Sequence, residues 1–250
     1  MTVSILGRDP RLRYCKEYLD RGKALPFATV ALTPIPTSTD GKTLKGSGEE
    51  LERATERLSS GDALVCYGLP REIKSKLVLR GAAVADLSGD EEFLEDNAAL
   101  TAIGAVGRIL TEQIKAPRDL SVGVIGYGRI GRKTVDHLAY LGARIRVFTS
   151  KTELARELSM LGISGLDSLS LEGAGEDVFS GLDILINTAP AMLVPISARN
   201  ALASVRVIEL ASGVNFPEGI TYERFASIPA EMYPKSAGMA LGAAVKRLLG

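Results

Sequence analysis

Three glycines at residues 126, 128 and 131, in the segment SVGVIGYGRIGRKTVDHL, constrain the fold more than any other feature of this chain. An apolar strand-like run precedes them, an amphipathic helical pattern follows, and a second apolar run arrives within about 30 residues. In that context Gly126 permits a tight turn, Gly128 lets the backbone approach a phosphate, and Gly131 lets helix and strand pack closely. The helix N-terminus then offers free N–H groups to a pyrophosphate. The spacing predicts a dinucleotide-binding βαβ unit, and the alternative is a glycine turn in a nucleotide-free sheet. The other residues of this loop, Tyr127, Arg129 and Ile130, are also expected to bind the cofactor.

Short apolar runs alternate with amphipathic stretches along the whole chain, which is typical of βαβ units in a parallel sheet. A first series predicts four strands, at residues 3–6, 29–32, 63–67 and 83–87. A second series predicts five, at residues 122–125, 145–149, 183–188, 205–210 and 227–230. Long helices are predicted at residues 90–114 and 236–249. We therefore expect an α/β protein with two Rossmann-like doubly wound domains, each with a parallel sheet, linked by a long helix.

These series also predict the domain organisation. Residues 1–94 are expected to form a small flavodoxin- or Rossmann-like domain, completed by the C-terminal helix at 236–250. Residues 95–235 are expected to form the NAD(P)-binding Rossmann domain. Within the first, residues 33–48 are rich in Pro, Gly, Ser and Thr, which predicts a surface loop.

Composition excludes several classes of protein. The 30 Lys and Arg residues balance 30 Asp and Glu residues, so no excess positive charge favours nucleic acid. No apolar run approaches the roughly 20 residues of a membrane span, and charged residues near the start argue against a signal peptide, so we expect a cytoplasmic protein without membrane contact. Cys15 and Cys66 are far apart and are expected to be structural thiols. A single histidine, His137, argues against a metal site.

The choice of cofactor depends on the end of the second strand of the βαβ unit. Proteins that bind NAD usually place an acidic residue there, on the ribose 2′-hydroxyl. This chain has Thr149, Ser150 and Lys151, and the first acid is Glu153. A hydroxyl and an ammonium could receive a 2′-phosphate, so we predict NADP. NAD stays the alternative if Lys151 is only a solvated residue.

Polar residues at the ends of later strands are expected to face the same cofactor. In a parallel sheet the carboxyl ends of the strands line one crevice. Asn187 and Thr188 would then bond the nicotinamide ribose, or else cap a following helix. The other residues expected on the cofactor side are Ala189, Pro190, Ala211 and Ser212.

Lys235 and Ser236 directly precede the last predicted helix. The amides at a helix N-terminus favour an anion such as a substrate carboxylate. Lys235 could also act as an acid or base. The alternative is that Ser236 is a helix cap and Lys235 is solvated.

On these residues the chain resembles the dipicolinate synthase A-subunit family. The matching segments are VSILGRDPRL, GYGRIG, LGARIRVFTSK, DILINTAPAMLV, IELAS and YPKSAG. The resemblance covers most of residues 95–250 and is thinner before residue 95. Relatives of this family include the nucleotide domains of D-isomer-specific 2-hydroxyacid dehydrogenases and of S-adenosylhomocysteine hydrolase. It implies NADP-dependent oxidation of a dihydro- or hydroxy-tetrahydrodipicolinate-type cyclic diacid by hydride transfer, as in dipicolinic acid biosynthesis during sporulation. It also implies a small flavoprotein-like second subunit, and a homo-oligomer is a further expectation.

Polar strand and helix ends that should meet at the carboxyl edge of the cofactor sheet predict the catalytic residues. Lys235 and Ser236 would hold one carboxylate of a diacid bound between the domains, and Asn97 or Thr101 would line the far side. Two segments depart from the family pattern. The helix segment NAALTAIG lacks the family's proline and has Ile103 in place of its glutamate, and Gly213 follows Ser212 where the family has arginine.

These departures leave two alternative functions open. One is a non-catalytic NAD(P)-binding partner or redox sensor, which would need only the glycine loop. The other is a 2-hydroxyacid dehydrogenase-like enzyme, which would need an arginine near Ser212 and a catalytic histidine. The only histidine, His137, lies in the helix that follows the glycine loop.

Overall fold

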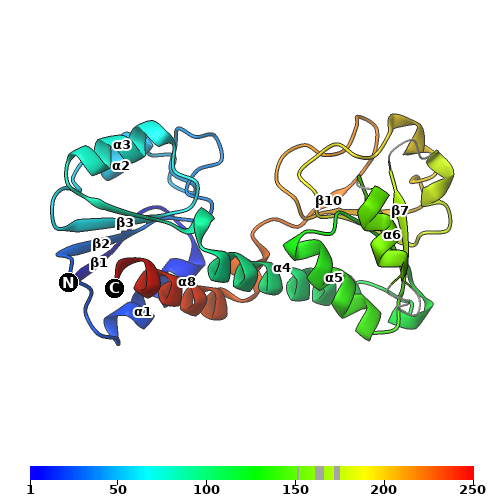
Figure 1. Ribbon diagram of the computed structural model, residues 1–250, viewed down its shortest axis with the longest axis horizontal. Helices are drawn as coiled ribbons and strands as arrows, with labels where there is room; N and C mark the ends of the chain where they lie inside the picture. Colours follow the sequence, from blue (N-terminus) through cyan, green and yellow to red (C-terminus); the bar gives the residue numbers. More distant parts are fainter. Residues whose placement is uncertain (151, 161–165, 172–174) are drawn as a thin grey trace. The chain divides into compact units, whose positions relative to one another are not determined.

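The computed structural model describes residues 1–150, 152–160, 166–171 and 175–250. The chain forms two compact units, the first made of Met1–Asn97 with Pro229–Gly250 and the second of Ala98–Ile228. Each unit contains a parallel sheet flanked by helices (Figure 1), so the predicted α/β class is confirmed. The long helix α4 (Glu91–Thr111) contributes to both units. The units divide inside this helix, three residues beyond the expected boundary, and the chain returns to the first unit at Pro229.

The sheet of the first unit has the strand order β1-β2-β3-β4. Its strands are β1 (Thr2–Ile5), β2 (Thr29–Leu32), β3 (Asp62–Cys66) and β4 (Ala83–Asp86). Helices α1 (Pro10–Asp20) and α8 (Pro234–Leu249) cover one face, and α2 (Leu51–Thr55) and α3 (Arg71–Leu79) lie on the other (Figure 1). The strand order never reverses, so this sheet lacks the switch point at which open α/β sheets bind nucleotides. A cofactor crevice of that kind is therefore confined to the second unit.

A buried ion pair fixes the start of α1. Asp9 caps the helix by accepting a hydrogen bond from the Arg11 amide at 3.0 Å, and the Arg11 Nη2 atom lies 2.6 Å from Asp9 Oδ2. Both side chains are only 3% exposed. Burial alone would raise the pKa of Asp9, but the hydrogen bonds and charge of Arg11 together hold it below its usual value. Arg11 also donates to the Ile35 carbonyl at 2.8 Å, which ties the loop after β2 to the helix.

The hydrogen bond from Arg11 to Ile35 shows that residues 33–48 are not simply the surface loop that the sequence predicted. Thr33 and Thr37 are buried, and their hydroxyl oxygens lie 2.9 Å apart. Thr37 also accepts a hydrogen bond from the Tyr67 amide at 2.7 Å. The first part of the segment is therefore packed over the ends of the strands. Residues 39–42 and 46–48 are exposed as predicted, but Leu44 between them is buried.

The sheet of the second unit has the order β10-β9-β8-β5-β6-β7, with every neighbouring pair parallel. Its strands are β5 (Ser121–Ile125), β6 (Arg144–Thr149), β7 (Leu166–Ser170), β8 (Ile184–Asn187), β9 (Arg206–Glu209) and β10 (Glu223–Arg224). Its helices include α5 (Arg129–Tyr140) and α6 (Thr152–Met160). Numbered from β5, the strand order is 3-2-1-4-5-6, the order of dinucleotide-binding sheets, and it reverses between β5 and β8.

Two elements near the end of the second series differ from the prediction. Residues 227–230 were expected to be a strand, but they enter the short helix α7 (Ile228–Met232), and the edge strand is β10 instead. The alternation of strands and amphipathic stretches also predicts a helix between β8 and β9, where the chain forms the short 3-10 helix η4 (Ile196–Arg199). A short apolar run does not distinguish a strand from one helical turn, which explains the error.

Both cysteines are buried and unbridged, as expected of structural thiols. Burial raises the pKa of Cys15 and of Cys66 to about 12. Among the described residues, no helix is long and apolar enough to cross a membrane. That same part of the chain contains no cluster of three or more His, Cys, Asp or Glu side chains suited to a metal ion.

The packing of α8 on α1 depends on glycine. A Cβ atom on Gly238 would lie 2.5 Å from Tyr14 Cβ and 2.6 Å from the Arg11 carbonyl oxygen. We therefore expect Gly238→Ala to lower the free energy of unfolding by about 1–3 kcal/mol, because the helices must separate. Urea denaturation followed by circular dichroism measures this change.

The matched control is Gly107→Ala, also inside a helix, where a Cβ would meet no atom within 4 Å. This variant should gain up to about 1 kcal/mol from the better helix propensity of alanine. Equal effects of the two substitutions would contradict the packing argument.

Candidate functional site: the carboxyl edge of the second sheet

The glycine loop joins β5 to α5 through a very close approach of backbone atoms. Gly126 has φ of +88°, a conformation that favours glycine. A Cβ atom on Gly131 would lie 2.3 Å from the Gly126 carbonyl oxygen and 2.9 Å from Thr188 Oγ1. Gly131 is also buried, so neither the loop nor the helix could move aside cheaply. Gly126 therefore permits the tight turn, and Gly131 lets the helix and the strand pack closely, as the sequence predicted.

Gly128 differs from its two neighbours because it faces open space. A Cβ atom there would meet nothing within 4 Å, and its φ of −79° is accessible to any residue. Gly128 is also the N-cap of α5, so the N-cap residue itself supplies no capping side chain. The first amides of α5 thus adjoin an unfilled space at the positive end of the helix dipole. This is the environment in which a pyrophosphate binds.

The other residues of the loop lie around this helix end. Arg129 and Ile130 are half-buried in the first turn of α5. Tyr127 packs against the apolar core on one face of the sheet, and burial raises the pKa of its hydroxyl.

The end of β8 lies beside β5, across the point where the strand order reverses. Thr188 Oγ1 donates to the Ile125 carbonyl at 2.8 Å, which joins the two strand ends. Asn187 is 1% exposed, and its Oδ1 accepts from the Ala189 amide at 3.1 Å. The alternative of a helix cap is wrong for Asn187, because no helix starts directly after β8, where the next helical element is η4. Its side-chain amide donates to Glu209 and to the Ala189 carbonyl. Contacts of Thr188, Ala189 and Pro190 with a cofactor stay a prediction.

Glu209 is the residue of this edge that the sequence analysis did not single out. It ends β9, is completely buried, and accepts hydrogen bonds from neutral groups of the described residues. These donors are Asn187 Nδ2 at 3.0 and 3.1 Å, the Ala211 amide at 2.8 Å and Asn215 Nδ2 at 3.1 Å. An acidic residue within the apolar run RVIEL is the signal that could have revealed it. The bonds of Glu209 hold the ends of β8 and β9 together.

The loop after β9 is bound by an arginine side chain that the sequence pattern did not reveal. Arg224, in β10, donates from Nη1 to the Ala211 carbonyl at 2.8 Å and from Nη2 to the Gly213 carbonyl at 2.5 Å. Its guanidinium therefore lies beside Gly213, where the family pattern has arginine. Ser212 between these carbonyls is exposed. No sequence signal could pair Arg224 with a position 11 residues earlier.

The residues expected to select the cofactor follow β6. Thr149 is buried as the last residue of the strand, and Ser150 is exposed directly after it. Lys151 lies outside the described residues. Ser150 is thus placed at the carboxyl end of the strand next to β5.

The four predicted catalytic residues belong to different units. Thr101 is buried in the second unit, whereas Asn97, Lys235 and Ser236 belong to the first. Asn97 Oδ1 accepts a hydrogen bond from Arg11 Nη1 at 3.5 Å. The helix α8 begins at Pro234 with Tyr233 as its N-cap, so the alternative that Ser236 caps it is wrong.

Lys235 is exposed and lines a pocket of about 270 Å³ between α1 and α8. Tyr14, Tyr18 and Lys246 line the same pocket. The ammonium of Lys246 lies 4.6 Å from the centre of the Tyr18 ring.

No protein-family model and no curated protein sequence matches this chain. Several solved structures match this chain in fold. The dipicolinate synthase A-subunit from Bacillus halodurans superimposes with a TM-score of 0.81 at 19% identity, covering 100% of this chain and 97% of that one. Its counterpart from Bacillus subtilis has a TM-score of 0.76 at 18% identity, covering 100% and 95%. D-lactate dehydrogenase from Escherichia coli has a TM-score of 0.58 at 14% identity, covering 99% and 96%. The resemblance to dipicolinate synthase is thus confirmed at the level of the fold.

The open space at Gly128 yields a prediction that separates binding from folding. We expect Gly128→Val to fold with a loss of no more than about 1 kcal/mol, because its backbone conformation suits valine and no atom lies in the way, although valine is a poorer N-cap than glycine. The valine side chain would fill the space beside the α5 amides. Affinity for NADPH, measured by calorimetry, should fall at least about tenfold.

Gly107→Val is the control, since that position is equally open but lies in α4. It should leave NADPH affinity unchanged. If Gly128→Val bound NADPH as tightly as the parent, the phosphate site would lie elsewhere.

Proposed function

We propose that this protein is an NADP-dependent oxidoreductase that oxidises a small cyclic dicarboxylate of the dihydrodipicolinate type by hydride transfer. The observation that carries the proposal is the N-terminus of α5, which begins at Gly128 beside open space where the order of a 3-2-1-4-5-6 sheet reverses. The structural likeness to dipicolinate synthase and to D-lactate dehydrogenase supports the same class of chemistry.

The residues of the second unit fit a nicotinamide dinucleotide. Amides from Gly128 to Gly131 would hold the pyrophosphate, and Thr188 to Pro190 with Ala211 and Ser212 would line the nicotinamide half. When bound, the oxidised nicotinamide supplies the acceptor for a hydride. The substrate ring loses that hydride from carbon and one proton from the adjacent ring atom, which together leave an aromatic diacid.

Two cationic side chains, one in each unit, support the proposal that the substrate is acidic. Arg224 is fixed at the carboxyl edge of the second sheet by two carbonyl groups, and its exposed guanidinium has further N–H groups for a carboxylate. Lys235 lies in the first turn of α8, where the helix dipole also favours an anion. In this proposal Arg224 supplies the charge that Gly213 lacks, Lys235 and Ser236 bind a carboxylate, and Asn97 and Thr101 contribute polar groups from α4. A flavoprotein-like second subunit belongs to the same proposal.

The preference for NADP rests on the absence of an acidic residue after β6. We expect Ser150→Asp to weaken NADPH binding roughly ten- to hundredfold relative to NADH, because the new carboxylate repels the 2′-phosphate and can accept from a ribose hydroxyl. Fluorescence titration of both reduced cofactors measures the ratio. The control is Ser150→Ala, which should shift the ratio less. An unchanged ratio in Ser150→Asp would place the adenosine ribose away from β6.

The substrate side is tested by removing each cation. Lys235→Ala should retain NADPH affinity, since Lys235 belongs to the first unit, and Arg224→Gln should lower it less than Gly128→Val does, since Arg224 does not contact the proposed pyrophosphate site. Each should lower kcat/KM for a dihydrodipicolinate-type diacid by about 2–4 kcal/mol, the range for losing a positioned charge. Steady-state formation of NADPH measures this loss.

Lys246→Ala is the matched control because Lys246 lines the same pocket as Lys235 from the far end of α8. It should leave kcat/KM unchanged. A parent protein that binds NADPH but turns over no cyclic diacid would instead indicate a redox sensor or non-catalytic partner.

A further inference from the structure

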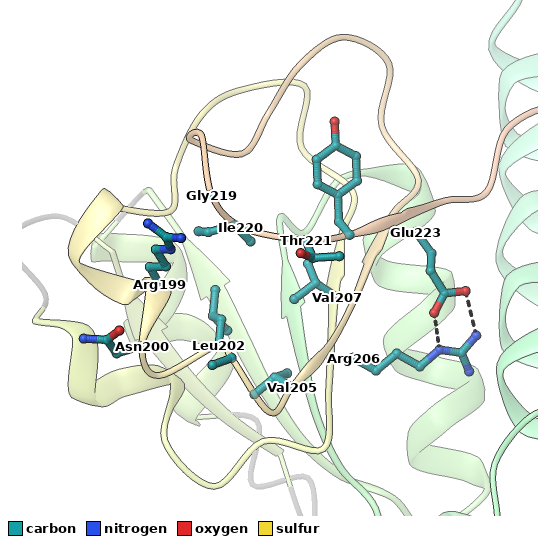
Figure 2. Close-up of a pocket in the computed structure, with 12 residues that line it drawn as sticks. Arg199, Asn200, Leu202, Val205, Arg206, Val207, Gly219, Ile220, Thr221 and Glu223 are labelled. Carbon is teal, nitrogen blue, oxygen red and sulfur yellow. Dashed lines mark hydrogen bonds and ion pairs between the residues drawn. The ribbon is translucent and has the colours of Figure 1, made fainter.

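The second unit contains a pocket of about 410 Å³ that is separate from the residues assigned above (Figure 2). Its walls come from the segment after η4, from the start of β9 and from the turn that leads into β10. The residues that matter for its chemistry are Arg199, Leu202, Val205, Val207, Ile220 and Thr221. Figure 2 shows Arg199 at one end, the Arg206–Glu223 pair at the other, and Leu202, Val205 and Val207 between them.

The two arginines of this pocket differ in their electrostatic state. Arg206 is neutralised, because Nε lies 2.7 Å from Glu223 Oε1 and Nη2 also pairs with Glu112. Arg199 is exposed and, within the described part of the chain, has neither a hydrogen bond nor an ion pair. One positive charge therefore stays unbalanced beside an apolar floor.

The Arg199 guanidinium lies against a glycine, Gly219. The Cβ position of Gly219 is only 2.9 Å from Arg199 Cζ, so the guanidinium lies in the recess that the missing side chain leaves. Gly219 also has φ of +86°, which favours glycine and turns the loop over the pocket. The cation thus lies against the backbone at the rim of the pocket.

These features match one class of ligand. The volume lies within the roughly 300–1,000 Å³ of small-molecule sites, and such sites combine apolar walls with a few placed polar groups. A buried apolar body would contact Leu202, Val207 and Ile220, and a carboxylate would pair with Arg199. We propose that this pocket binds a small organic carboxylate with an apolar body, as a second site beyond the proposed function.

The position of the pocket on the strand separates it from the cofactor crevice. Residues 205–207 lie at the amino end of β9, whereas Glu209 and the proposed cofactor residues lie at its carboxyl end. Ligands of open α/β sheets bind at the carboxyl ends, so occupancy here would not displace the dinucleotide.

The test uses benzoate as the probe and benzamide as its neutral counterpart, with the full chain labelled for amide NMR. Benzoate should shift the signals of residues 202–207 and 219–221, and benzamide should bind at least about tenfold more weakly. Arg199→Gln should lower benzoate affinity roughly ten- to hundredfold while NADPH affinity is retained. The control Arg118→Gln removes another arginine of this unit and should change neither.

Three outcomes would overturn the proposal. Equal binding of benzoate and benzamide would indicate an apolar cavity without a carboxylate site, and benzoate binding that survives Arg199→Gln would remove the assigned cation. Benzoate shifts confined to residues 126–131 would place the acid at the cofactor crevice. Failure of the parent to bind NADPH would count against the proposed function alone, because the benzoate titration needs no cofactor.

Discussion

The second unit depends on the close approach of Gly131 to the Gly126 carbonyl and to Thr188. No side chain fits between these groups, since a Cβ on Gly131 would lie 2.3 Å from the carbonyl oxygen. The contact brings the N-terminus of α5 directly against the ends of β5 and β8. Because α5 then starts at Gly128, whose Cβ position is open, its first amides lie beside open space at the point where the strand order reverses. A packing constraint of the backbone thus creates the space in which we propose that the pyrophosphate binds.

A second interaction shapes the same edge. Glu209 is fully buried, and burying an acidic group without hydrogen bonds is costly. Its bonds to Asn187, the Ala211 amide and Asn215 satisfy both oxygens and fix the loop after β9. That loop in turn offers two carbonyls to Arg224. The cation at this edge is therefore positioned by a network that begins at a buried carboxyl.

The sequence predicted those parts of the structure that depend on residues close together in the chain. The glycine spacing, with a strand before it and a helix after it, predicted the βαβ unit and the parts of Gly126 and Gly131. Long-range pairings were not predictable in this way. Nothing in the composition of residues 33–48 shows that Arg11 bonds the Ile35 carbonyl, and nothing near Gly213 shows that Arg224 reaches it. The two-residue strand β10 is too short to leave a periodic pattern.

The most direct test of the central claim is a crystal structure of the full chain with NADPH bound. The account predicts the pyrophosphate on the amides of residues 128–131 at the start of α5, the 2′-phosphate beside Ser150, and the nicotinamide toward the ends of β8 and β9. A pyrophosphate bound at any other place, or an adenosine ribose far from the end of β6, would contradict it.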